Sequence, residues 1–173
     1  LYINDLPRNV KNTSPSIFAD DTKLAGKVNT EEESKGIQSD LDALERWSDV
    51  WQLKFNLDKC HVLHFGSKNM RRDYQLCSLA LTHVTEEKDL GVVISEDMKA
   101  EKNVARNVKK ADKILGMIRR TFSYMDKDML QQLIKVFIRP HLEYAQQAWS
   151  PYLKKDISLL ESVQRRATKL LPN

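Results

Sequence analysis

Two adjacent carboxylates, Asp20 and Asp21, are the residues of this chain whose type and spacing are best suited to chemistry. They lie between two short runs, Ser16 to Ala19 and Leu24 to Val28, and this pattern predicts a β-hairpin with both charges at its tip. Neighbouring like charges repel each other, a bound cation offsets that repulsion, and hard carboxylate oxygens suit Mg²⁺. Because Asp-Asp is also favourable turn chemistry, the pair alone leaves both interpretations open.

Cysteine and histidine side chains are a second group with metal-binding chemistry, but their spacing disfavours a zinc site. If residues 60–65 form a strand, Cys60 and His64 point to one face and His61 points to the other. Ligands on opposite faces of a strand cannot converge on one tetrahedral ion. Cys60 and Cys77 are also too few to cross-link a domain of this size, so we expect reduced thiols.

The composition indicates a folded protein whose positive charge is unevenly distributed. Its 173 residues, 41% of them hydrophobic, suffice for one core of ordinary size or two small lobes. Residues 1–60 hold 8 Lys/Arg and 11 Asp/Glu, whereas residues 61–173 hold 20 and 13, so net charges of −3 and +7 make up the total of +4. An acidic segment joined to a basic one is typical of an enzyme that follows phosphates, although ordinary solvated helix faces give the same counts.

The chain has neither a long apolar run nor a signal-peptide pattern. No run approaches the ~20 apolar residues that span a bilayer, so we expect no membrane partner and a nuclear or cytoplasmic location. The chain opens on the apolar run that starts at Leu1, which is typical of the middle of an element. We therefore expect a fragment of a longer protein.

Residue patterns predict an α+β first half, in which one helix packs on a small antiparallel sheet. Thr30 followed by Glu33 is a capping box, and apolar residues at helical spacing extend the predicted helix to Trp51. We expect Trp47 and Trp51 to close the core rather than to stack on bases. Besides the hairpin, alternating apolar and polar residues predict a strand at 53–57, and short apolar runs predict strands at 61–65, 79–84 and 90–94.

Helical periodicity continues through the rest of the chain. An apolar stripe that steps by three and four residues predicts a helix over about 98–122, with most of its Lys and Arg off the stripe. Further helices are predicted at 130–137, where Pro140 then interrupts, at 142–149 and at 157–170. Because the period changes from two to 3.6 near residues 95–97, the predicted domains are 1–95 and 96–173.

Several sequence blocks occur in a distinctive order along nearly the whole chain. They are LYINDLP from Leu1, FADDTKL from Phe18, LKFNLDKC from Leu53, KDLGVVIS from Lys88, LGMIRRTF from Leu115, IRPHLEYA from Ile138 and LLESVQRRATKL from Leu159. Their order and spacing resemble the reverse transcriptases (RNA-directed DNA polymerases) of jockey-like non-LTR retrotransposons. The resemblance implies an incomplete polymerase palm over 1–95 and a helical thumb over 96–173. It also implies RNA template, DNA primer and RNA–DNA hybrid as partners, and Mg²⁺ with no small-molecule cofactor.

By this resemblance, Asp20 and Asp21 are catalytic metal ligands, and Asp20 is the principal one. Nucleotide addition needs two Mg²⁺ ions roughly 3.5–4 Å apart, and in the family these ions are bridged by a third Asp from an upstream strand. That strand would precede Leu1. We therefore expect the isolated chain not to polymerise.

The resemblance also assigns roles to residues outside the first hairpin. Lys59 would act near the triphosphate as a catalytic cation, although a surface lysine at a strand start is an equal alternative. Leu90, Gly91 and Val92 match the primer grip, where a glycine allows close approach of the backbone to a nucleic-acid strand. The alternative for these three residues is a turn or bulge that serves the fold.

Basic side chains of the second half are candidates for phosphate binding. Those expected to bind nucleic acid are Arg106, Lys109, Lys110, Lys113, Arg165 and Arg166. Two alternatives to a polymerase fragment remain: a non-catalytic nucleic-acid-binding module and a helical interaction remnant. Salt-sensitive binding to RNA–DNA hybrid would distinguish these two alternatives from each other.

Overall fold

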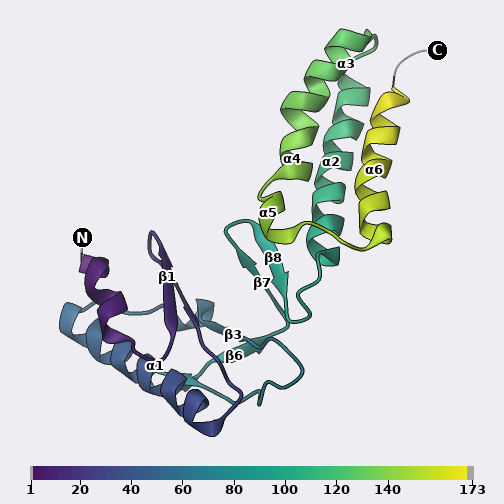
Figure 1. Ribbon diagram of the computed structural model, residues 1–173. Helices are drawn as coiled ribbons and strands as arrows, with labels where there is room; N and C mark the ends of the chain where they lie inside the picture. The colour runs from purple at the N-terminus through teal and green to yellow at the C-terminus, as the bar shows by residue number, and fades with distance from the viewer. Residues whose placement is uncertain (1, 171–173) are drawn as a thin grey trace. The chain divides into compact units, whose positions relative to one another are not determined.

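The computed structural model describes residues 2–170, which form two compact units that divide between Thr85 and Glu86 (Figure 1). The fold is α+β, as the sequence predicts. The segment 86–95, expected to belong with the first half, packs instead with the helices of the second unit, because Val92 shares a core with Val104 and Trp149. Within residues 2–170, no helix has both the length and the apolar character needed to cross a membrane.

The first unit combines short strands with one long helix. In chain order its elements are η1 (Tyr2–Asn9, a 3-10 helix), β1 (Ser14–Phe18), β2 (Asp21–Ala25), α1 (Glu31–Trp51), η2 (Leu57–Lys59, 3-10), β3 (His61–Leu63), β4 (Gln75–Leu76), β5 (Leu79–Ala80) and β6 (Thr82–Val84). They form antiparallel pairs β1–β2 and β4–β5 and a parallel pair β3–β6, rather than one antiparallel sheet.

Three predicted strands of this unit differ in the structure, and the one expected over 61–65 is shorter, since β3 ends at Leu63. Residues 53–56 are irregular rather than a strand, and η2 follows because Lys59 and Cys60 donate backbone hydrogen bonds to Asn56 and Leu57 and close a tight turn. The predicted strand 79–84 is divided into β5 and β6 at Leu81, whose N–H donates a hydrogen bond to the Tyr74 carbonyl (2.8 Å).

The helix α1 organises the core of the first unit. Its capping box forms as predicted, since Thr30 accepts a hydrogen bond from the Glu33 N–H (3.2 Å) and Glu33 accepts one from the Thr30 N–H. Trp47 is buried and donates its indole N–H to Asp5 (2.9 Å), whereas Trp51 is 39% exposed at the helix end and does not close the core as expected. The buried core residues are Leu6, Val10, Leu44 and Trp47.

The second unit is one hairpin and a helical bundle. Its elements are β7 (Glu86–Asp89), β8 (Val92–Ser95), α2 (Glu101–Thr121), α3 (Lys127–Leu133), η3 (Ile134–Ile138, a π-helix), α4 (Arg139–Glu143), α5 (Gln146–Trp149) and α6 (Lys154–Thr168). The ion pairs Lys155–Glu101 (2.6 Å) and Arg166–Asp112 (2.7 Å) link α6 to α2.

Several predicted helix boundaries change in this unit, and the helix predicted at 142–149 is divided into α4 and α5 before Gln146, where Ala145 has a left-handed backbone (φ 50°). The first helix begins at Glu101 rather than near Met98, because Met98 has a left-handed backbone (φ 56°). Pro140, expected to interrupt the second helix, lies in the first turn of α4 after a π-helical segment, a place where its missing N–H is tolerated.

Candidate functional site

The tip of the β1–β2 hairpin is a two-residue turn. Phe18 pairs with Asp21, which leaves Ala19 and Asp20 to close the turn. Ala19 has φ 55°, a left-handed conformation that costs a residue with a Cβ about 1–2 kcal/mol. The turn is therefore tight and strained.

The tip presents both carboxylates to solvent. Asp20 and Asp21 are exposed, and the neighbouring Phe18 side chain is 63% exposed. Among residues 2–170, no hydrogen bond or ion pair joins either carboxylate to another side chain. The sequence thus predicted the hairpin and its charged tip, although the strands lie a few residues earlier than the apolar runs suggested.

The carboxylate pair fits part of a magnesium site. Across the described chain, no three His, Cys, Asp or Glu side chains come together in a way that could hold a metal ion. Mg²⁺ keeps several waters and is commonly bound by one or two carboxylates together with substrate phosphates. Asp20 and Asp21 could supply such carboxylates, and the remaining ligands would come from outside this hairpin.

Lys59 lies at the end of η2, just before β3. Its side chain is exposed, and within residues 2–170 no hydrogen bond or ion pair joins it to Asp20 or Asp21. The structure therefore does not bring the three predicted catalytic residues into contact, and a catalytic role for Lys59 stays a prediction.

The cysteine and histidine residues take up separate positions. Cys60 and Cys77 are free and half-buried. His64 is buried beside His83, with ring centroids 4.8 Å apart, and its Nε2 has no partner in the described structure. Burial, with His83 and Arg71 nearby, lowers the pKa of His64 below 6.5 and favours a neutral ring.

The predicted primer-grip residues lie on the β7–β8 hairpin. Leu90 and Gly91 form its two-residue turn, with φ values of 44° and 86°, so Leu90 is not in a strand as expected. The Leu90 carbonyl accepts a hydrogen bond from the Tyr144 hydroxyl (2.9 Å), and the Gly91 carbonyl accepts one from Arg106 (3.3 Å). Val92 is buried in the core, so only the turn residues of this segment are exposed.

Some of the predicted phosphate-binding side chains have no partner in the described structure, and others form hydrogen bonds within the protein. Lys109, Lys110 and Lys113 are exposed on α2, opposite its buried stripe, and no described side chain pairs with them. Arg106 is half-buried and bonded to Gly91. Arg166 binds both carboxylate oxygens of Asp112 (2.7 and 2.9 Å), and Arg165 is exposed with one long contact to the Ser158 carbonyl (3.5 Å).

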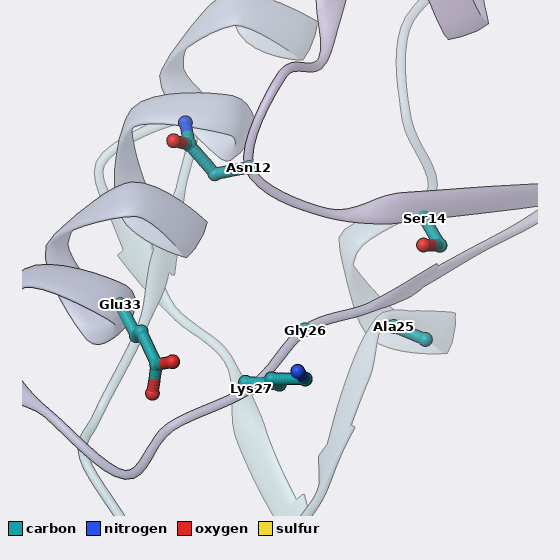
Figure 2. A pocket seen from close by; sticks show the side chains of 6 residues that line it. All are labelled: Asn12, Ser14, Ala25, Gly26, Lys27 and Glu33. Atoms are coloured by element: carbon teal, nitrogen blue, oxygen red, sulfur yellow. The ribbon is translucent and has the colours of Figure 1, made fainter.

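An open pocket of about 480 Å³ lies at the base of the first hairpin (Figure 2). The carboxylates lie at the other end of this hairpin, since Ser14 pairs with Ala25 and Phe18 pairs with Asp21. Its lining residues are Asn12, Ser14, Ala25, Gly26, Lys27 and Glu33. Two of its polar groups already serve the fold, since Glu33 caps α1 and the Asn12 amide donates to Asp40 (2.9 Å). We therefore assign the candidate site to the hairpin tip.

Sequence reasoning missed two residues that hold the hairpins in place, Asp40 and Tyr144. A signal for Asp40 was present, because it lies four residues before Leu44 and seven before Trp47, on the buried face of α1. Tyr144 carried no such signal, since its contact with Leu90 spans 54 residues of chain.

Comparison with known proteins gave no relative: no protein-family model, curated protein or solved structure matches the chain. Its function must therefore be inferred from the geometry of its own residues and from the order of its sequence blocks.

Proposed function

We propose that this chain is part of an RNA-directed DNA polymerase of the non-LTR mobile-element type, with the first unit contributing to the palm and the second forming the thumb. The observation that carries the proposal is the tight hairpin that holds Asp20 and Asp21 in the open at its tip. The order of the sequence blocks supports the same assignment.

The hairpin tip would contribute two carboxylates to the catalytic centre. When bound there, Mg²⁺ would supply the positive charge that activates the primer 3′ hydroxyl and neutralises the departing pyrophosphate. Asp20, within the turn, and Asp21, at the start of β2, would orient their oxygens toward that charge. Their exposure leaves room for a primer end and a triphosphate.

The second unit would hold the nucleic acid. Lys109, Lys110 and Lys113 form a patch of exposed positive charge on one helix face, here called the lysine face. Such cations meet phosphates rather than base edges, so this binding would have no sequence preference. The exposed turn at Leu90 and Gly91 would lie along the primer strand.

A second candidate function is nucleic-acid binding without catalysis. The lysine face favours it, because phosphate binding by these side chains needs no metal. The hairpin tip, with only two carboxylates, would then be a turn whose charges have no catalytic use.

A chimaera distinguishes these two functions. Residues 1–173 would replace the matching region of an active non-LTR reverse transcriptase, which supplies the remaining metal ligand and the fingers. We expect template-dependent primer extension that is lost in Asp20→Asn and Asp21→Asn. A folded chimaera that bound hybrid duplex, yet extended primers no better than these variants, would leave only the non-catalytic function.

A further inference from the structure

The chain segment that leads into the carboxylate hairpin is bound to one buried carboxylate of α1. Asp40 is 2% exposed and accepts hydrogen bonds from three consecutive backbone N–H groups, those of Lys11 (3.0 Å), Asn12 (2.9 Å) and Thr13 (2.8 Å). The Asn12 amide (2.9 Å) and the Thr13 hydroxyl (2.8 Å) donate to it as well. Five donors therefore fix the residues that immediately precede β1.

Two glycines let both ends of the hairpin lie close to α1. A Cβ on Gly36, one turn before Asp40, would lie 2.9 Å from the Cβ of Asn12. A Cβ on Gly26, directly after β2, would lie 2.8 Å from the Ile37 side chain. Both distances are too short for packed carbon atoms. At Gly36 the neighbour is a Cβ that moves only with the backbone of Asn12, so a glycine is required there, whereas at Gly26 the end of the Ile37 side chain would have to shift.

Asp40 tolerates burial only because its hydrogen bonds are complete. Burial by itself raises the pKa of Asp40, but the donors from Lys11, Thr13 and Asn12 outweigh it and hold the pKa below the ordinary 3.8. A buried carboxylate satisfied by five donors defines one geometry, since any other would leave a charge or an N–H group without a partner. β1 begins at Ser14, directly after Thr13, so no free residue separates the anchor from the hairpin.

We propose that Asp40 is a positioning residue for the hairpin tip, which sets the direction of Asp20 and Asp21 by fixing residues 11–13 on α1. The proposal rests on the proposed role of these two carboxylates in metal-dependent nucleotide transfer. Such chemistry requires ligands held within about 0.5 Å of their productive positions, and a two-residue turn cannot provide this unless the base of its hairpin is fixed.

A spin label at the tip measures this direction without any metal. The label is attached through Asp20→Cys in a Cys60→Ser, Cys77→Ser background, and its broadening of the α1 amide signals is recorded by NMR. With Asp40 present, we expect the broadening to differ steeply between successive turns of α1, because the label is held in one position relative to the helix. We call this difference along the helix the broadening gradient. In Asp40→Asn, whose amide cannot accept from all five donors, we expect that gradient to flatten while the α1 amides keep their shifts.

Two further variants keep the test decisive. Thr13→Val removes a single donor, so it should flatten the gradient in part even if Asp40→Asn does not fold. Asp42→Asn, which removes an exposed carboxylate on the same helix, should leave the gradient unchanged.

The outcomes separate positioning from stability and from the proposed function. A residue that only stabilised the fold would lower the melting temperature and leave the gradient of the folded protein intact, and that result would overturn the proposal. Failure of Asp20 and Asp21 to bind a divalent ion would instead reject the polymerase assignment, and the label would still report on Asp40.

Discussion

The two tight hairpins of this protein are anchored at opposite ends. The β1–β2 hairpin is fixed at its base by Asp40, and at its tip Asp20 is exposed with no side-chain partner in the described structure. The β7–β8 hairpin is fixed at its tip, where Tyr144 and Arg106 bind both turn carbonyls. An anchored base leaves side chains free to bind a ligand, whereas an anchored tip fixes the path of the backbone.

This difference suits the two tasks that a polymerase would give the hairpins. A metal needs carboxylates that solvent and substrate can reach. A nucleic-acid strand needs a backbone surface of fixed shape, and a turn whose carbonyls are occupied presents chiefly N–H donors to a phosphate. Mutations at each anchor test this difference, and removal of the base anchor should have the largest effect.

Removal of the base anchor should destabilise the first unit most. Asp40→Ala leaves three backbone N–H groups and two side-chain donors without their acceptor, so we expect a loss of about 3 kcal/mol or more in the free energy of unfolding. Urea denaturation of the first unit measures it. Asp42→Ala should change it by less than about 0.5 kcal/mol, as is usual at exposed sites.

The same anchor predicts an acid dependence. Because the folded-state pKa of Asp40 lies below 3.8, its contribution is fully present above that value and is lost as the pH falls through the lower folded-state pKa. Below about pH 4, the free energy of unfolding of the wild type should fall more steeply with decreasing pH than that of Asp40→Asn. Equal slopes for the two proteins would contradict the anchor.

The lysine face on α2 provides the next test. Replacing Lys109, Lys110 and Lys113 with Gln should weaken RNA–DNA hybrid binding and lower its salt slope by roughly 0.9 for each phosphate that is no longer neutralised, without unfolding α2. Fluorescence anisotropy over a salt series measures both quantities. Gln at the exposed residues Lys127, Lys135 and Lys154 removes the same charge elsewhere in the unit and should have a clearly smaller effect.

The anchored tip should not accept a side chain at Gly91. Gly91→Ala forces a Cβ into a left-handed conformation, 3.1 Å from the Tyr144 ring, and we expect a loss of about 1–3 kcal/mol in the stability of the second unit. Thermal unfolding measures this loss. An unchanged melting temperature would show that the turn relaxes freely and that the tip is not anchored.

The reciprocal change at the free tip should be mildly favourable. Ala19→Gly relieves the left-handed strain at φ 55°, but the extra chain entropy of glycine offsets part of the gain, so we expect about 0.5–1 kcal/mol of added stability. Urea denaturation of the first unit detects it. A destabilised variant would mean that the methyl group of Ala19 has a packing role.

The sequence predicted the local features better than the anchors. The capping box placed the start of α1 at Thr30, and the paired carboxylates placed the first hairpin, because these signals depend on neighbouring residues. The predicted strand at 53–57 was wrong. An alternating pattern of only five residues is a weak signal for a strand, and a 3-10 turn forms at its end instead. Neither anchor was predicted, because Asp40 and Tyr144 act on segments 27 to 54 residues away.

The most direct test of the central claim is a Mn²⁺ titration of the 173-residue chain followed by NMR. Mn²⁺ substitutes for Mg²⁺ and broadens the signals of nearby amides. We predict selective broadening of the hairpin tip from Phe18 to Thr22, at lower Mn²⁺ concentration when an RNA–DNA primer–template is bound, because its phosphates add ligands. Asp20→Asn should abolish the broadening. If the tip broadens no more than other acidic surface residues, with or without hybrid, the carboxylate hairpin is not a metal site and the polymerase assignment is contradicted.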